Sequence, residues 1–343
     1  MPEVKNAVLK LVIIDEVSMC SAKMLDSIEE KMSLIRKNSG AFGGFSIVLF
    51  GDLLQIPPVE AEWVFKSKWW HSFEYAELQI NLRQLLDPEF SQMLQRWRVG
   101  KINDADRLFL QKKCVVSKGP PRYFDRVSDT FIKIEKGDSL VLTHRNASAS
   151  EINKRVIKTK FGAPLSSVST VYHRIVKENV CERILVNEFQ IACGTKVMIN
   201  ENLPCGLRNG EIARIVEIHA DKNQNVERVD LMPTSSHIVQ TVHRRVKRRD
   251  VGTNERQAKL YLPFIPAYAA TFHKAQGQTL DRVVLELSAS KMDAGLFFVG
   301  ASRVRCGDDF YITNYHKNFQ IKVNTEARDE YNRLRLLINL PPI

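Results

Sequence analysis

Two short apolar runs that stop abruptly at acidic residues constrain the fold of this chain most. Leu11–Ile14 is followed by Asp15 and Glu16, and Ile47–Phe50 is followed two residues later by Asp52. Aliphatic runs of this length predict strands that are buried on both faces of a parallel sheet. Acidic residues directly after such strands lie at the carboxyl edge of the sheet, where open α/β folds bind ligands.

The segment between the two runs has the spacing of a helix. Leu25, Ile28, Met32 and Ile35 recur at helical intervals, and charged residues occupy other faces. A strand, a crossover helix and a second strand make a βαβ unit. The sequence therefore predicts an α/β fold.

The acidic edge suits nucleotide hydrolysis. Asp15 is predicted to hold Mg²⁺, usually through water, and Glu16 to polarise the attacking water. Asp52 and Gln55 are candidates for sensing a terminal phosphate. An Asp-Glu pair after a strand is a weak signal alone, because acids also follow strands for solubility. Its pairing with GDLLQIPPV at 51–59 makes the signal strong.

Two stretches of sequence carry a family resemblance. DEVSM at Asp15–Met19 and AFGGFSIVLFGDLLQIPPV at Ala41–Val59 resemble the second and third motifs of the Pif-one (petite integration frequency) helicases, which are superfamily 1B relatives of RecD. The resemblance implies two RecA-like parallel-sheet domains, the first N-terminally incomplete, with a small β-barrel inserted in the second. Ala41 stands where the family usually has Pro, and Leu53 and Leu54 stand where it has aromatics, which leaves the subfamily open.

The function that this resemblance implies is ATP-dependent, 5′-to-3′ DNA unwinding. ATP and Mg²⁺ are the implied cofactors, and single-stranded DNA and duplex junctions are the implied partners of a monomer. Arg83 in LQINLRQ matches the fourth motif and would reach a triphosphate. Arg303 in GLFFVGASRVR matches the arginine finger of the sixth motif, a group that contributes roughly 10³–10⁵ in rate. Gln276 and Gly277 match the fifth motif and are expected to contact the nucleotide.

Further residues match the family positions that grip the DNA backbone. These are Pro57, Pro58, Thr143, His144, Arg145, Asn146, Thr271, His273 and Lys274. Hydroxyl, amide and cationic donors at a helix N-terminus suit phosphate, and Ser148 and Glu151 fit a capping box for such a helix. A turn with solvated polar groups is the alternative for the segment from Thr143 to Asn146.

Changes of pattern along the chain mark the expected domains. Between Cys193 and Leu262, short alternating strands and an Asn209-Gly210 hairpin turn resemble the small Src-homology-three-like barrel of the family. The expected boundaries are 1–80 for the partial first motor domain, 81–192 and 263–343 for the two parts of the second, and 193–262 for the barrel.

Local patterns give four smaller expectations. Asp87-Pro88 predicts the start of a helix, and Ala267–Ala275 predicts another helix. The polar stretch 116–137 predicts a connecting loop. Trp63, Trp69 and Trp70 lie among lysines and could stack on bases, but packing beneath a loop is the favoured interpretation.

The charge balance favours a polyanionic partner, because the net charge is +11 and the pI is near 9.3. HRRVKRRD at 243–250 could track phosphates, act as a nuclear address or form a solvated strand face. No apolar run approaches the roughly 18 residues of a membrane span, and six cysteines without a CxxC pair predict reduced thiols. We expect an intracellular protein with no membrane partner, in the nucleus or alternatively the mitochondrion.

A phosphate-cradling GxxxxGK[ST] string does not occur in the printed sequence. We therefore expect that this chain alone neither binds ATP tightly nor unwinds DNA, as a truncated product or incomplete gene model would behave. We also expect its first sheet to be exposed and marginally stable. A nucleic-acid-binding remnant without catalysis is one alternative. An ATP-driven protein remodeller is another, which the basic charge disfavours.

Overall fold

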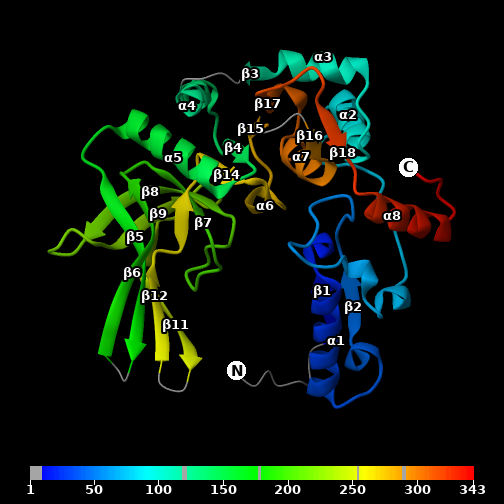
Figure 1. The fold of residues 1–343 in the computed structure, drawn as a ribbon, viewed down its shortest axis with the longest axis horizontal. Helices are drawn as coiled ribbons and strands as arrows, with labels where there is room; N and C mark the ends of the chain where they lie inside the picture. The colour runs from blue at the N-terminus through cyan, green and yellow to red at the C-terminus, as the bar shows by residue number, and fades with distance from the viewer. Residues whose placement is uncertain (1–9, 118–121, 177–178, 253–254, 288–290) are drawn as a thin grey trace. The chain divides into compact units, whose positions relative to one another are not determined.

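A computed structural model describes residues 10–117, 122–176, 179–252, 255–287 and 291–343 (Figure 1). Its contacts divide the chain into two compact units. The first unit comprises 1–112, 289–308 and 316–343, and the second comprises 113–288 and 309–315. Every helix in these ranges is too short or too polar to cross a lipid bilayer.

Among the described residues, the first unit contains two parallel sheets of two strands each and five α-helices. Its strands and α-helices are β1 (Leu11–Ile14), α1 (Ala22–Arg36), β2 (Ser46–Leu49), α2 (Pro88–Arg98), α3 (Asp104–Lys112), β16 (Lys291–Asp293), α7 (Ala294–Ala301), β18 (Gln320–Lys322) and α8 (Thr325–Leu337). Short 3₁₀ turns occur at η1 (Val17–Met19), η2 (Ala41–Gly44), η3 (Val64–Lys66) and η4 (Trp70–Ser72).

The two strands predicted around the acidic residues are confirmed. They pair in parallel, with Ile14 opposite Leu49. The predicted burial on both faces is wrong, because the described sheet has only these two strands and Ile13 keeps 59% of its surface exposed. The sheet is instead exposed, which agrees with the separate expectation that the first sheet would be exposed.

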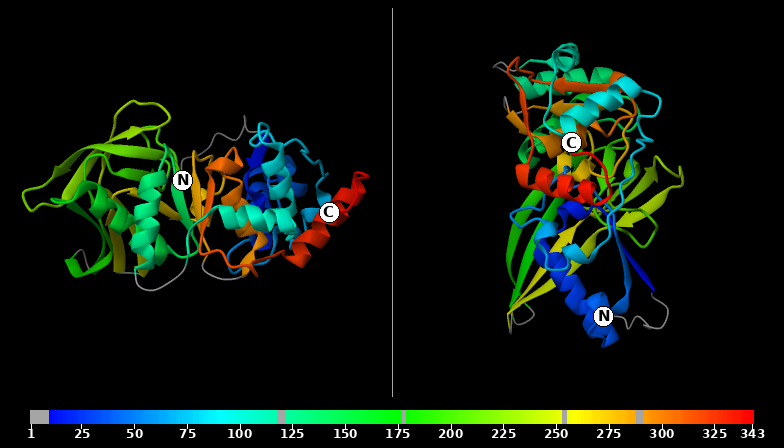
Figure 2. Two further views of the ribbon diagram at one scale, coloured as in Figure 1. Left: turned by 90° about the horizontal axis from the view of Figure 1, so that it is seen from above. Right: turned by 90° about the vertical axis from the view of Figure 1, so that its right-hand side faces the viewer.

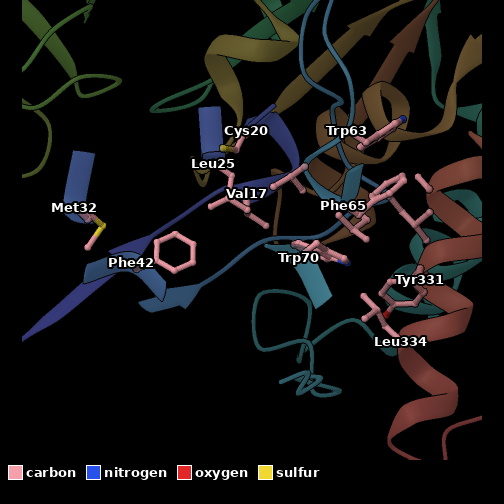
Figure 3. Packing of buried hydrophobic residues seen from close by; sticks show 14 of the residues in the cluster. Val17, Cys20, Leu25, Met32, Phe42, Trp63, Phe65, Trp70, Tyr331 and Leu334 are labelled. Atoms are coloured by element: carbon pink, nitrogen blue, oxygen red, sulfur yellow. The ribbon is translucent and has the colours of Figure 1, made fainter. Parts of the chain in front are cut away.

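A single apolar cluster holds the first unit together (Figure 3). Trp63 and Trp70 are buried in it, and Trp69 packs against it. The indole of Trp70 also donates a hydrogen bond of 2.6 Å to Glu330 on α8. The packing interpretation of the tryptophans is therefore confirmed, and α8 closes the cluster with Tyr331.

The predicted start of α2 is also confirmed, because the Asp87 side chain accepts a hydrogen bond from the Phe90 backbone and Pro88 is the first helical residue. The buried face of α2 packs against α7, where the rings of Trp97 and Phe297 lie 5.2 Å apart. Residues 81–112 therefore belong to the first compact unit. The compact units differ in this respect from the domain boundary expected at residue 80.

The second unit is built on a parallel sheet with the strand order β14-β4-β15-β17-β3. The strands are β3 (Cys114–Val116), β4 (Leu140–Thr143), β14 (Ala269–Thr271), β15 (Val283–Glu286) and β17 (Phe310–Thr313), the last after the 3₁₀ turn η5 (Gly307–Asp309). The helices are α4 (Tyr123–Ile134), α5 (Asn146–Phe161) and α6 (Phe272–Ala275). This mixed architecture confirms the predicted α/β class.

Three local predictions in this unit are wrong. The stretch 116–137 contains α4, because its apolar residues Val127 and Phe131 fall on one buried helical face. The helix α5 begins before Ser148, so no capping box forms there, and Glu151 instead pairs with Arg155 one turn later. The helix predicted over 267–275 keeps only its last four residues as α6, since β14 takes the apolar residues before it.

Antiparallel strands make up the remainder of the second unit (Figures 1 and 2). They are β5 (Ser166–Val176), β6 (Asn179–Ile191), β7 (Lys196–Ile199), β8 (Ile212–Ala220), β9 (Val226–Pro233), β10 (Gln240–His243), β11 (Arg245–Gly252), β12 (Glu255–Tyr261) and β13 (Phe264–Pro266). They form two sheets, of order β11-β12-β5-β6 and β10-β9-β8-β7-β13. The all-β segment thus begins at Ser166, ahead of Cys193, and its closure into a barrel stays a prediction.

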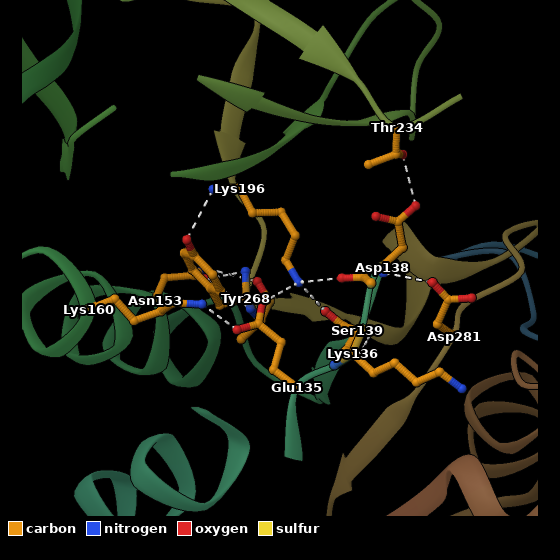
Figure 4. Close-up of polar contacts among 12 residues, drawn as sticks. Glu135, Lys136, Asp138, Ser139, Asn153, Lys160, Lys196, Thr234, Tyr268 and Asp281 are labelled. Carbon is orange, nitrogen blue, oxygen red and sulfur yellow. Dashed lines mark hydrogen bonds and ion pairs between the residues drawn. The ribbon is translucent and has the colours of Figure 1, made fainter. Parts of the chain in front are cut away.

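A buried lysine joins the antiparallel sheets to the parallel sheet (Figure 4). Lys196 on β7 is fully buried, and its ammonium lies 2.9 Å from the Glu135 carboxylate and 2.8 Å from the Ser139 carbonyl. Nearby, the Thr234 hydroxyl donates to Asp138 over 2.8 Å. Burial lowers the pKa of Lys196, and the charge of Glu135 opposes that shift.

Candidate nucleotide and DNA sites

The carboxyl ends of β1 and β2 are held together by backbone hydrogen bonds. The Phe50 nitrogen donates to the Ile14 carbonyl, and the Val17 nitrogen donates to the Phe50 carbonyl, each over 2.8 Å. Gly51 is required at this approach, because a Cβ there would lie 2.7 Å from the Val17 nitrogen. Between the strand and η1, Glu16 adopts a left-handed backbone conformation with φ of 52°. Such uncommon conformations of non-glycine residues cluster at functional sites.

The donors at this edge fit Mg²⁺. Asp15 is exposed at the end of β1, and one of its carboxylate oxygens accepts a hydrogen bond of 2.8 Å from the Glu16 backbone. Three residues further on, the Ser18 hydroxyl is buried with no hydrogen-bond partner in the described structure. Carboxylate oxygens and water are the ligands that Mg²⁺ prefers in proteins.

Asp52 has a structural partner that the sequence did not suggest. Its two oxygens receive the Arg98 guanidinium at 2.7 and 2.8 Å, and one of them also accepts from the Leu54 backbone over 3.0 Å. The Arg98 guanidinium lies 4.7 Å from the centre of the Tyr331 ring. Asp52 therefore anchors α2 to the GDLLQ loop, and its expected role beside phosphate stays a prediction.

A cavity of about 1120 Å³ in the first unit is lined by half of the predicted nucleotide residues. It brings together Asp52, Gln55, Arg83 and Arg303, which come from three separate stretches of the chain. The side-chain oxygen of Gln55 is buried there without a hydrogen-bond partner among the described residues. Buried polar atoms are normally paired, so this oxygen has capacity for a bound ligand or water. Gly295 at the start of α7 allows close approach to the Gln55 carbonyl.

The two predicted arginines are both fixed at the end of α7. The Arg83 guanidinium donates to the Ser302 carbonyl over 3.0 Å. Arg303 donates to the Val299 carbonyl and to the Ser302 hydroxyl, each over 2.7 Å, and is only 3% exposed. Gln84, which no motif singled out, donates to the same Ser302 carbonyl over 3.2 Å. The fourth and sixth motif segments are therefore held as one structure.

The positive charges of the arginines at the cavity repel one another. Burial, and then the positive charge of Arg83, lower the pKa of Arg303 to about 10, while Glu16 opposes the shift. Burial likewise lowers the pKa of Arg83, again with opposition from Glu16. Glu16, Arg83 and Arg303 are thus close enough to interact electrostatically. A polyanionic ligand would relieve the repulsion between the arginines.

The two predicted DNA-binding segments of the second unit meet at one edge of its parallel sheet. β4 and β14 are neighbours, and Thr143 lies directly opposite Thr271. Both threonines are buried, and the Thr143 hydroxyl donates to the Arg145 carbonyl over 2.9 Å, which shapes the turn. The side chains that this edge exposes are His144, Arg145, Asn146, His273 and Lys274.

The electrostatics of the two segments confirm that they are neighbours. Partial desolvation by neighbouring groups, and then repulsion from His144, lower the pKa of His273. Partial desolvation also lowers the pKa of Lys274. Sequence reasoning missed Gln278, whose amide donates to the Lys274 carbonyl over 2.9 Å and to the Gly210 carbonyl over 3.1 Å. This amide links the candidate DNA-binding segment to the Asn-Gly turn, and no pattern in the sequence signals the contact.

The remaining predicted residues lie elsewhere. Gln276 and Gly277 follow α6 in the second unit, and Gly277 needs the left-handed φ of 77°. Pro57 is half-buried and Pro58 is buried, both in the first unit. Neither proline nor Gln276 lines the cavity of the first unit.

A three-residue group of potential metal ligands was also missed. Glu217, His219 and Asp230 lie together on β8 and β9, where the His219 imidazole is 2.9 Å from the Asp230 carboxylate. The Asp230 carboxylate also accepts from the Thr241 hydroxyl over 2.6 Å. These are ordinary partners for a cross-strand ion pair.

The fold and these two polar edges define an α/β protein with a RecA-like parallel-sheet core. The family model described as PIF1-like helicase matches residues 3–108. The chain is 27% identical over 337 residues to the ATP-dependent DNA helicase PIF1 of Danio rerio, covering 95% of this chain and 49% of that protein. It is 23% identical to the ATP-dependent DNA helicase RRM3 of Saccharomyces cerevisiae, covering 96% of this chain and 54% of that protein.

Solved structures show the same fold. The Pif1 helicase from Candida albicans superposes with a TM-score of 0.77 at 21% identity, covering 96% of this chain and 77% of that chain. A Bacteroides Pif1 helicase in complex with ADP-AlF3 and single-stranded DNA superposes with a TM-score of 0.74 at 19% identity, covering 96% and 76%. The resemblance to PIF1-like helicases is confirmed. The chain spans about half the length of the curated relatives it matches.

Proposed function

We propose that this chain is the hydrolytic and strand-gripping part of an ATP-driven, 5′-to-3′ DNA helicase. The observation that carries the proposal is the convergence of Gln55, Arg83 and Arg303 on one cavity, beside the acidic edge that bears Glu16. Its relatives are named ATP-dependent DNA helicases, and the Bacteroides structure holds a nucleotide analogue with single-stranded DNA.

Each residue has a role that its chemistry supports. Asp15 would hold Mg²⁺, which supplies charge neutralisation for the phosphates when bound. Glu16 would accept a proton from the attacking water. Gln55 would hydrogen-bond the terminal phosphate through its amide. Arg83 and Arg303 would stabilise the negative charge that develops on the transferred group.

The exposed polar edge of the second unit would hold the DNA. Arg145 and Lys274 provide cations for phosphates, and Asn146 lies at the N-terminus of α5, whose first backbone N–H groups favour anions. We infer single-stranded DNA as the partner, with duplex junctions at the point of unwinding. We also infer a monomer that acts in the nucleus.

The test uses a motor that is completed in cis with a phosphate-binding loop segment. Glu16→Gln should retain ATP binding and lose DNA-stimulated hydrolysis, because the amide cannot accept the proton. Arg303→Lys should lose turnover by about 10³-fold, because an ammonium cannot reproduce the two-nitrogen contact. Lys31→Gln, an exposed change on α1, is the charge control. Turnover within a few-fold of wild type in either test variant would remove that residue from its role.

A further inference from the structure

One face of the antiparallel sheet β11-β12-β5-β6 carries four cationic side chains from three neighbouring strands. In its register, Lys247 on β11 lies directly opposite Lys259 on β12, and Arg249 lies opposite Gln257. Gln257 in turn lies opposite Arg174 on β5. Directly paired residues share a face of a sheet, and residues two apart on a strand also share it. We call Arg174, Lys247, Arg249 and Lys259 the basic face.

Most of this charge is not neutralised. Lys247 and Arg249 are exposed, and within the described ranges no carboxylate lies within ion-pair distance of Lys247, Arg249 or Lys259. Arg174 lies 4.0 Å from the Glu182 carboxylate, so it is the member of the basic face with an anionic neighbour. Like charges placed directly opposite each other destabilise a sheet, so the Lys247 and Lys259 pair costs stability in the free protein. A polyanion on this face would remove that cost.

The aromatic residues of the basic face are covered. The Lys259 ammonium lies 4.8 Å from the ring centre of Tyr261 and 5.9 Å from that of Tyr172. Tyr261 is also buried, and its hydroxyl donates to Glu201 over 3.0 Å. Binding of single strands without sequence preference relies on open aromatic rings on which bases stack. Because Tyr261 is buried and Tyr172 is half-buried, this face offers cations with little open aromatic surface, which suits a phosphate backbone rather than exposed bases.

The cations of the basic face are spaced regularly, both along each strand and between neighbouring strands. Strand geometry places Lys247 and Arg249 about 7 Å apart along β11, and it places neighbouring strands about 4.8 Å apart. The motif HRRVKRRD is thereby divided between two faces. Lys247 and Arg249 belong to the basic face, whereas Arg248 lies opposite Ala258 on the other face.

We propose that the basic face binds the phosphate backbone of double-stranded DNA without regard to sequence. This rests on the proposed helicase function, in which duplex lies ahead of the strand that is being separated. The site is distinct from the exposed edge at the ends of β4 and β14, because it uses a different sheet of the second unit. In Figure 1 the strands β5, β6, β11 and β12 extend away from β4 and β14.

The experiment compares two triple variants of equal charge. The test variant is Lys247→Gln, Arg249→Gln and Lys259→Gln. The control variant is Arg183→Gln, Arg248→Gln and Arg256→Gln, because register places these three residues on the opposite face of the same sheet. Anisotropy with a labelled blunt duplex of about 20 base pairs, and with one of its strands alone, would be measured from about 50 to 200 mM salt.

The test variant should bind duplex at least tenfold more weakly, with a log-log salt slope shallower by up to about 2.7, or about 0.9 for each lost phosphate contact. The control should bind duplex within about threefold of wild type, and both triples should bind single strands almost normally. Lys274→Ala should have the opposite effect and weaken binding of single strands but not of duplex. The two proposed sites can therefore be tested independently.

Three results would overturn the proposal. One is unchanged duplex affinity in the test variant with a normal melting temperature. Another is an equal loss in the control, which would show that only net charge matters. The third is a loss for single strands as large as that for duplex, which would assign the face to the unwound strand.

Discussion

His273 is the candidate DNA-binding residue whose ionisation offers the most direct test of that role. Partial desolvation and the neighbouring His144 lower its pKa, so it is mainly neutral in the free protein near pH 7. Phosphates would favour the charged form and raise the pKa in the complex. Binding would then take up a proton between the two pKa values, and the affinity for single strands should rise as pH falls from about 8 to 6.

The measurement is the pH dependence of single-strand affinity at constant ionic strength. His273→Gln should flatten the profile, because glutamine keeps a hydrogen-bonding amide and cannot be protonated. His243→Gln, which alters an exposed histidine on β10, should leave the profile unchanged. The same slope in His273→Gln as in wild type would show that this histidine does not face the DNA.

At the scale of helices and strands, the sequence predicted features that depend on residues within one turn or on one helix face. The cap at Asp87 and the apolar stripe of α2 were readable, because both lie within one turn or one helix face. α4 was missed because its stripe lies in a largely polar stretch next to two prolines. The whole of β14 was predicted as helix, because small apolar residues show no period that separates the two structures.

In the candidate nucleotide site, too, some residues could be predicted from the sequence and others could not. Glu16, Arg83 and Arg303 were identified by motif, and the structure places them within electrostatic range of one another. The partner of Asp52 was not predictable, because Arg98 lies 46 positions away and no pattern links them. Ion pairs between distant segments depend on tertiary packing, which cannot be predicted from composition or residue spacing.

The junction at β7 gives a stability prediction at the scale of elements. Lys196→Ala should lower the free energy of unfolding of the second unit by about 3 kcal/mol, because it removes a buried partner and leaves Glu135 poorly compensated. Lys160→Ala removes the other cation on Glu135, but this side chain is partly exposed, so the loss should stay within about 1 kcal/mol.

Urea denaturation followed by far-ultraviolet circular dichroism would measure both variants. A double variant, Lys196→Met with Glu135→Leu, should recover much of the loss, because it replaces the buried ion pair with apolar side chains of similar size. Equal losses for Lys196→Ala and Lys160→Ala would show that burial does not set the strength of this junction.

At the scale of the whole molecule, the two candidate sites belong to different compact units. The candidate nucleotide cavity lies within the first unit, and the candidate DNA-binding edge lies within the second. DNA binding can therefore be measured without nucleotide, and hydrolysis variants in the first unit serve as independent controls. The net charge of +11 favours association with any polyanion, so affinity alone cannot locate the strand.

The salt dependence of single-strand binding can locate it. Each phosphate contact on a single strand contributes about −0.7 to the log-log slope of affinity against salt. Arg145→Ala combined with Lys274→Ala should make the slope shallower by about 1.4, since both cations lie at the exposed edge of the second unit. Lys23→Ala combined with Lys31→Ala removes the same charge from exposed positions on α1 and should leave the slope unchanged. If both pairs change it equally, or if wild-type affinity is flat between low and moderate salt, these segments do not grip the strand.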